Sequence, residues 1–113
     1  MIINNIEMLD LDVYDLEVAE NYEKALELLQ GIEEKTKNKG IAEGIKIQCN
    51  IIFDFFNIMY GEGADRKIFG DKVNLVTCLD ALGEFMEQFN TQGTNTFNSI
   101  NNKYSPNRAK RRK

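Results

Sequence analysis

Few residues of this chain could do chemistry on a substrate, because it contains no His. Acid–base catalysis near neutral pH would lack its usual group, a serine-type triad would lack its base, and a zinc site would lack its commonest nitrogen ligand. No motif in the sequence supplies a paired nucleophile and base. We therefore expect a protein that is not an enzyme, with no catalytic residues, no metal site and no cofactor.

The two cysteines are the remaining side chains with intrinsic reactivity. Cys49 and Cys78 both fall within apolar stretches of helical periodicity. Two cysteines do not make the disulfide framework of a small secreted protein, so we interpret them as reduced, buried side chains in a cytosolic protein. A redox pair is the alternative, although the separation of the two residues matches no redox or metal-binding motif.

Three further patterns resemble sites but have simpler structural explanations. The Gly-Glu-Gly segment 61–63 lacks the preceding strand and the other residues of a phosphate-binding loop, and is more typical of the end of a helix. The acidic residues within 10–17 lack the central Gly of a calcium-binding loop and suit a helix N-terminus. Asp54 lies among Ile and Phe residues, where burial would raise its pKa. We expect it instead to occupy the one polar strip of its helix.

Charge is distributed very unevenly along the chain, and the net charge of −4 hides this. Residues 1–30 contain eight acidic residues and one Lys, whereas residues 103–113 contain six basic residues and no acidic one. This asymmetry predicts a basic tail that engages an acidic surface, either of a protein or of a nucleic acid. Nucleic acid is the less favoured partner, because the acidic body would repel phosphates. The residues expected to act in this electrostatic tail are Arg108, Lys110, Arg111 and Arg112.

Hydrophobic periodicity predicts an all-α fold. Apolar residues recur at alternating spacings of three and four in about three amphipathic helices, at roughly residues 15–39, 41–60 and 74–103. Asp15 and Asn74 are positioned to act as N-caps of the first and third helices. A single helical domain is therefore expected.

The segments outside these helices have weaker patterns. Residues 1–14 allow a strand, but with no second strand to pair with, an extended arm or a short helical lead-in is the favoured prediction. Residues 64–69 can form one helical turn. We expect the domain to cover residues 1–104 and residues 105–113 to form a disordered basic tail. The N-terminus lacks the pattern of a secretory signal, which favours a cytoplasmic location.

The helix at 41–60 is the most apolar segment and carries two apolar stripes. A helix that is apolar on two faces must lie between neighbours, either inside the domain or across an interface. It is not predicted to span a membrane, because charged residues interrupt it. We expect one stripe to supply exposed contacts for a protein partner, and these partner-binding residues are Ile47, Ile51, Phe55 and Ile58.

Several stretches of the C-terminal two thirds resemble a known group of proteins. These are EGIKIQCN at 43–50 followed by FDFF at 53–56, the segment from GEG to IFG at 61–70, and KYSPNRAKRR at 103–112. Over about residues 40–113 the chain resembles small proteins encoded by tailed phages and prophages of Gram-positive bacteria. Those proteins look like products of the tail-gene region, near the tape-measure gene, where tail assembly chaperones are encoded.

The resemblance implies a non-enzymatic role in tail assembly and carries no catalytic residues with it. The expected partner is a phage tail protein, such as the tape-measure protein, bound in the cytoplasm of the host bacterium. Self-association into a homo-oligomer stays open. The alternative function is that of a small accessory or host-directed protein that binds nucleic acid or an acidic partner through its basic tail.

Overall fold

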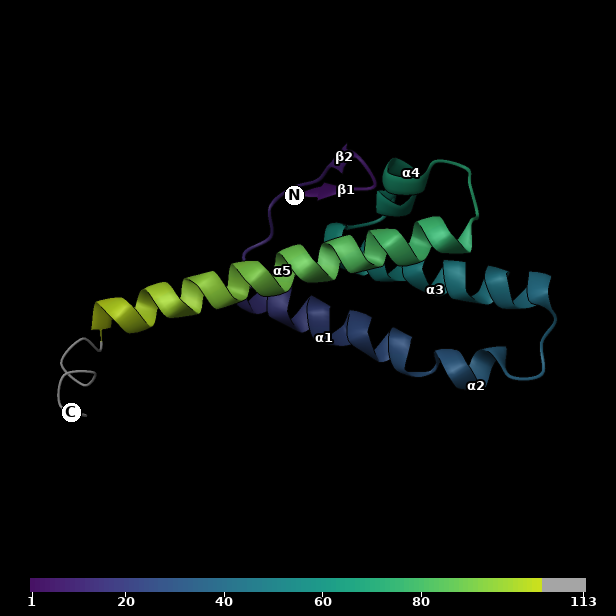
Figure 1. The fold of residues 1–113 in the computed structure, drawn as a ribbon, viewed down its shortest axis with the longest axis horizontal. Coiled ribbons are helices and arrows are strands. Elements are labelled where there is room, and N and C mark those ends of the chain that lie inside the picture. Colours follow the sequence, from purple (N-terminus) through teal and green to yellow (C-terminus); the bar gives the residue numbers. More distant parts are fainter. Residues whose placement is uncertain (105–113) are drawn as a thin grey trace.

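The computed structural model describes residues 1–104, with side chains described for residues 1–93. The chain forms a small helical bundle with a two-stranded hairpin at its N-terminus (Figure 1). The all-α class expected from periodicity is confirmed. The elements, in chain order, are β1 (Ile2–Ile3), β2 (Ile6–Glu7), α1 (Leu16–Gln30), α2 (Ile32–Thr36), α3 (Ile41–Tyr60), α4 (Ala64–Phe69) and α5 (Leu75–Tyr104).

Helix α3 is the central element, and α1, α2, α4 and α5 all contact it. Its bounds agree with the helix predicted at 41–60, and α5 agrees with the one predicted at 74–103. The helix predicted at 15–39 is instead divided at Gly31 into α1 and α2. Gly is a poor residue for a helix interior, and the apolar stripe on either side of it conceals this break from the periodicity.

The N-caps predicted from sequence are confirmed at both long amphipathic helices that flank α3. The Asp15 carboxylate accepts a hydrogen bond from the backbone N–H of Glu17 at 3.0 Å. The Asn74 side chain does the same for the backbone N–H of Thr77, also at 3.0 Å. Each cap satisfies a donor that the first turn of a helix leaves without an internal partner.

We expect Asp15→Ala to lower the free energy of unfolding by about 1 kcal/mol, because it removes the N-cap of α1. Chemical denaturation measures this loss directly. Glu20→Ala is the matched control, since Glu20 is an exposed acid of the same helix. An equal loss in both variants would mean that the change in charge, rather than the cap, causes the effect.

The core is built around the ring of Phe85 on α5. Its side chain is fully buried. Its centroid lies within 6.4 Å of the ring centroids of Tyr22, Phe55, Phe56, Tyr60 and Phe89. Because these rings come from α1, α3 and α5, this one aromatic cluster joins all three long helices.

The N-terminal segment differs from the predicted arm or helical lead-in. Strands β1 and β2 pair antiparallel, with Ile2 opposite Glu7 and Ile3 opposite Ile6. The turn between them places Asn4 and Asn5 at positive φ, 52° and 63°. Two consecutive residues at positive φ make a type I′ turn, which suits the twist of a hairpin and which Asn tolerates. The strand therefore does have a partner, supplied by the residues just after the turn.

The hairpin seals one side of the core between α4 and α5. Ile3 is fully buried. The side-chain amide of Gln88 donates to the Ile2 carbonyl at 2.7 Å, and its oxygen accepts from the Ile2 N–H at 3.2 Å. The side chain of Asn4 donates to the carbonyl of Ile68 on α4 at 2.8 Å. These bonds satisfy backbone groups that a lone two-residue strand would leave unpaired.

The segment at 61–63 ends a helix, as the sequence predicts. Gly61 caps α3 at φ 101°, and its N–H donates to the carbonyl of Asn57 at 2.8 Å. Gly63 adopts a left-handed conformation, φ 96°, and precedes α4. The single helical turn predicted at 64–69 is confirmed as α4.

Helix α5 extends beyond the rest of the bundle at its C-terminal end (Figure 1). Near residue 93 it is crossed by the segment that leads into α1. The Tyr14 hydroxyl donates a hydrogen bond to the carbonyl of Gly93 at 2.9 Å. The Val13 side chain also packs closely on Gly93, since a Cβ atom added to this glycine would lie 3.4 Å from it. Within the described part of the chain, no helix combines the length and the hydropathy needed to cross a membrane.

Candidate protein-binding face

The four predicted partner contacts on α3 do not share one environment. Phe55 is 0% exposed and Ile51 only 7%, so the expectation that these two are exposed is wrong. Phe55 packs edge-on against Phe56 of α3 and Phe85 of α5. Ile47 and Ile58 are half-buried. Ile51 and Phe55 of this second stripe are therefore core residues rather than exposed contacts.

The uncovered apolar surface lies elsewhere, and the contacts between aromatic rings of the three long helices locate it. Tyr22 of α1 and Phe56 of α3 both lie beside Phe85 of α5. Two helical turns from this level, or seven residues along each helix, lie Leu29 on α1, Cys49 on α3 and Cys78 on α5. The thiols of Cys49 and Cys78 interact, so α3 and α5 remain in contact at this second level. Figure 1 shows that α1 and α5 diverge toward this end of the bundle.

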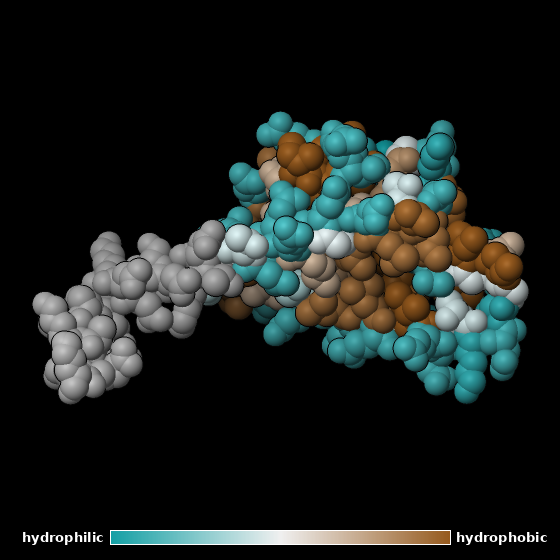
Figure 2. Space-filling view, in the orientation of Figure 1, coloured by the Kyte–Doolittle hydropathy of each residue, from teal (hydrophilic) through white to brown (hydrophobic). Residues whose placement is uncertain are grey.

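At the divergent end α2 also packs against α3, and apolar residues of α1, α3 and α5 remain partly or largely exposed. Several leucines and isoleucines beside the core are half-buried here. Leu79 and Ile41 are more exposed, at 47% and 85%. Figure 2 shows hydrophobic side chains gathered over this part of α5, α3 and α1. We call this surface the apolar face, and its residues are Leu29 of α1, Ile41 and Ile45 of α3, and Leu75, Leu79 and Leu82 of α5.

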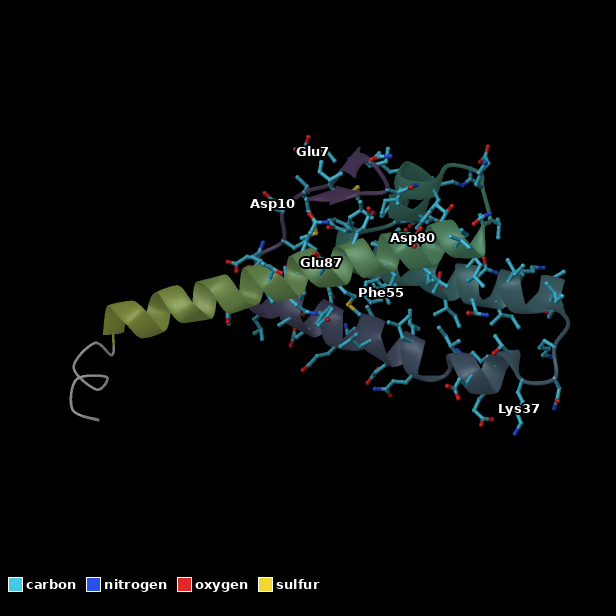
Figure 3. All side chains as sticks on the ribbon, viewed as in Figure 1. Glu7, Asp10, Lys37, Phe55, Asp80 and Glu87 are labelled. Carbon is cyan, nitrogen blue, oxygen red and sulfur yellow. The ribbon has the colours of Figure 1, made fainter. Side chains whose placement is uncertain are left out.

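Acidic residues border the apolar face on α5. On α5, Asp80 and Glu87 are exposed on the side turned toward the viewer in Figure 3. On α1, Glu23 and Glu27 are exposed on the side of the helix that faces away from the apolar stripe. A ligand that is apolar at its centre and basic at its margin therefore matches this surface in both hydropathy and charge.

The predicted electrostatic tail lies outside the described residues. Arg108, Lys110, Arg111 and Arg112 all belong to the segment 105–113, so the structure places none of them. Their contribution rests on the sequence alone, which brings six basic residues together at 103–113 with no acidic one among them.

Cys49 and Cys78 are free and fully buried, as the sequence analysis expects. Burial raises the pKa of the Cys78 thiol to about 12, and its hydrogen bond with the Cys49 side chain contributes to the rise. A thiol with so high a pKa stays protonated at neutral pH and is a poor nucleophile. The pair therefore serves as core packing between α3 and α5 in the folded protein.

We expect the free energy of unfolding to fall as the pH rises from about 9 toward 12. The pKa of Cys78 rises from 9.0 to about 12, and burial together with Asp10 raises that of the Tyr60 hydroxyl from 10.0 to about 12. In this range the unfolded chain loses protons that the folded chain retains, so unfolding becomes easier. Urea titrations at a series of pH values measure the decrease. Stability that stayed constant from pH 8 to 11 would contradict the burial of these groups.

The described residues hold no grouping of three or more acidic or cysteine side chains suited to a metal ion. Asp54 is exposed, so it is not buried among the Ile and Phe residues that surround it in the sequence. It lies at an open pocket of about 340 Å³ with Leu28, Asn57, Ile58 and Glu62. This places Asp54 on a polar strip of α3, as expected, and Ile58 at the pocket wall.

Comparison with known proteins places the chain in a family. The profile of a "Family of unknown function (DUF6673)" matches residues 4–113, which is nearly the whole chain. The chain belongs to this family. No curated protein and no solved structure matches it. The DUF6673 match begins after β1 and includes β2, all the helices and the basic tail.

The apolar face was not among the sites predicted from sequence. Leu75, Leu79 and Leu82 belong to a stripe that is buried farther along α5, and periodicity does not tell where along a stripe the covering helix ends. The signal available in the sequence was the presence of large apolar residues at the very start of two helices, Ile41 directly after Gly40 and Leu75 directly after Asn74.

Proposed function

We propose that this protein is a non-enzymatic phage or prophage protein that assists tail assembly by binding a helical segment of another phage structural protein, the tape-measure protein. The observation that carries the proposal is the apolar face, where three helices leave an apolar surface that a further helix can cover. Large exposed apolar surfaces on small proteins mark sites of protein interaction. The resemblance of residues 40–113 to products of the tail-gene region supports the choice of the tape-measure protein as the proposed partner.

The chemistry of the face suits an amphipathic helix. Such a helix places apolar residues at spacings of three and four into an apolar site between helices. The acidic residues Asp80 and Glu87 beside the apolar stripe of α5 favour a helix with basic residues along the margin that meets them. A long helical tape-measure protein offers many segments of this kind.

Co-expression with the tape-measure protein encoded alongside this chain tests the proposal. We expect the two proteins to co-purify, with the apolar face protected from hydrogen exchange in the complex. A failure to co-purify with any protein of the tail, under conditions where both chains are folded, would overturn it.

The alternative function is nucleic-acid binding through the basic tail, with Arg108, Lys110, Arg111 and Arg112 neutralising phosphates. The observation that favours it is the acid-free run of basic residues at 103–113. Binding of this kind is strongly salt-dependent and independent of sequence. A gel shift at low salt that disappears when residues 105–113 are removed would support this alternative over tail assembly.

A further inference from the structure

We infer that the apolar face also accepts the C-terminal end of α5 from a second copy of this chain, so that the protein self-associates. This inference concerns the protein alone and does not rest on the proposed function. It follows from the register of α5, from the reach of the chain and from the distribution of charge.

The spacing of the large apolar residues on one side of α5 repeats along the helix. Leu79, Leu82 and Met86 recur eighteen residues later as Phe97, Ile100 and Tyr104, with the same spacings of three and four. Eighteen residues are five turns of an α-helix, so the two triplets share one side of α5. The second triplet has the spacing with which an amphipathic helix binds an apolar site.

The second triplet belongs to the part of α5 that leaves the bundle. The contacts of Val13 and Tyr14 with α5 are made at Gln92 and Gly93. From there α5 continues to Tyr104, about three further turns, and Figure 1 shows this part extending past the other elements. A continuous helix cannot fold back, so this segment cannot cover the apolar face of its own copy.

The residues after α5 cannot reach that face either. Leu82, the residue of the apolar face nearest to the end of α5, is twenty-two residues from Tyr104, which is about 33 Å along the helix axis. The nine residues 105–113 span at most about 32 Å when fully extended. Docking of the C-terminal segment on the apolar face therefore requires a second copy.

Charge favours the same arrangement. The segment 103–113 brings six basic residues together at the end of the second triplet, and the exposed acids Asp80 and Glu87 border the apolar stripe of α5. An apolar helix end followed by basic residues thus meets an apolar face bordered by acids, which favours this pairing over contact between two like ends. Reciprocal exchange gives a dimer, and exchange in one direction gives longer assemblies. A partner's helix would displace the docked segment from the face.

Light scattering after size-exclusion chromatography on the full-length protein tests the inference. We expect a mass of at least twice the 13.0 kDa of one chain. The variants Leu79→Asp and Ile100→Asp should each run as monomers, and their equimolar mixture should recover part of the assembly, because each supplies the element that the other lacks. Leu9→Asp, a change of the same kind at an exposed residue outside the face, should retain the wild-type mass.

Cross-linking identifies the contact itself. We expect a Leu79→Cys copy mixed with an Ile100→Cys copy to give a cross-linked pair with a short bis-maleimide, whereas the wild-type protein, whose cysteines are buried, gives none. Circular dichroism confirms that each variant is helical. A monomeric wild-type protein, an assembly unaffected by Leu79→Asp and Ile100→Asp, or a mixture without the cross-linked pair would overturn the inference.

Discussion

We expect Phe85→Ala to destabilise the protein by about 3–5 kcal/mol, the range for removing a buried aromatic ring. Phe85 is fully buried and its ring lies between rings from α1, α3 and α5. Domains of this size are stable by only about 5–15 kcal/mol, so the variant should be close to unfolding at room temperature. Urea denaturation followed by circular dichroism measures the loss.

Phe85→Leu is the matched control for this prediction. Leu retains much of the volume and all of the apolar character, so we expect its cost to be clearly below that of Ala. Phe53→Ala provides a second comparison, because Phe53 is only half-buried and contacts Phe69 at the edge of the cluster. Equal costs for Phe85→Ala and Phe53→Ala would contradict a core centred on Phe85.

The sequence predicts the helices well where apolar spacing and end signals agree. Asn74 caps α5 and Gly61 ends α3, and both helices follow the predicted ranges. It predicts the N-terminus less well, because a hairpin of two-residue strands is too short to leave an alternating pattern. Its one signal is the pair Asn4-Asn5, which favours the left-handed turn.

The candidate site is less predictable than the fold, because burial depends on where neighbouring helices end. Phe55 and Leu79 both belong to apolar stripes of similar appearance. Phe55 lies within the aromatic cluster, whereas Leu79 lies where α1 has diverged from α5. Only the three-dimensional arrangement separates the covered stripe from the open one, and for that reason the predicted contacts Ile51 and Phe55 proved to be core residues.

We expect Leu79→Asp to weaken the binding of the tape-measure helix by at least about tenfold. Burying a Leu side chain contributes about 1.5–3 kcal/mol, and each 1.4 kcal/mol changes affinity about tenfold. An Asp at this position would in addition place a charge within an apolar contact. Isothermal titration of the folded variant with the tape-measure segment measures the change.

The control for this prediction is Leu9→Asp, since Leu9 is 76% exposed and lies outside the apolar face. We expect it to bind as the wild type does, and we expect the thermal stability of both variants to stay close to that of the wild type. If Leu9→Asp weakened binding as much as Leu79→Asp, general charge repulsion rather than the apolar face would govern the interaction.

Photo-cross-linking from position 79 during tail assembly tests the central claim most directly, namely that the apolar face is where this protein binds a helical segment. With a photoreactive side chain at position 79, we predict adducts whose peptides map to a helical segment of the tape-measure protein, and no such adducts from position 9. Adducts from position 79 that never contain a tail protein, or that form equally from position 9, would contradict the account.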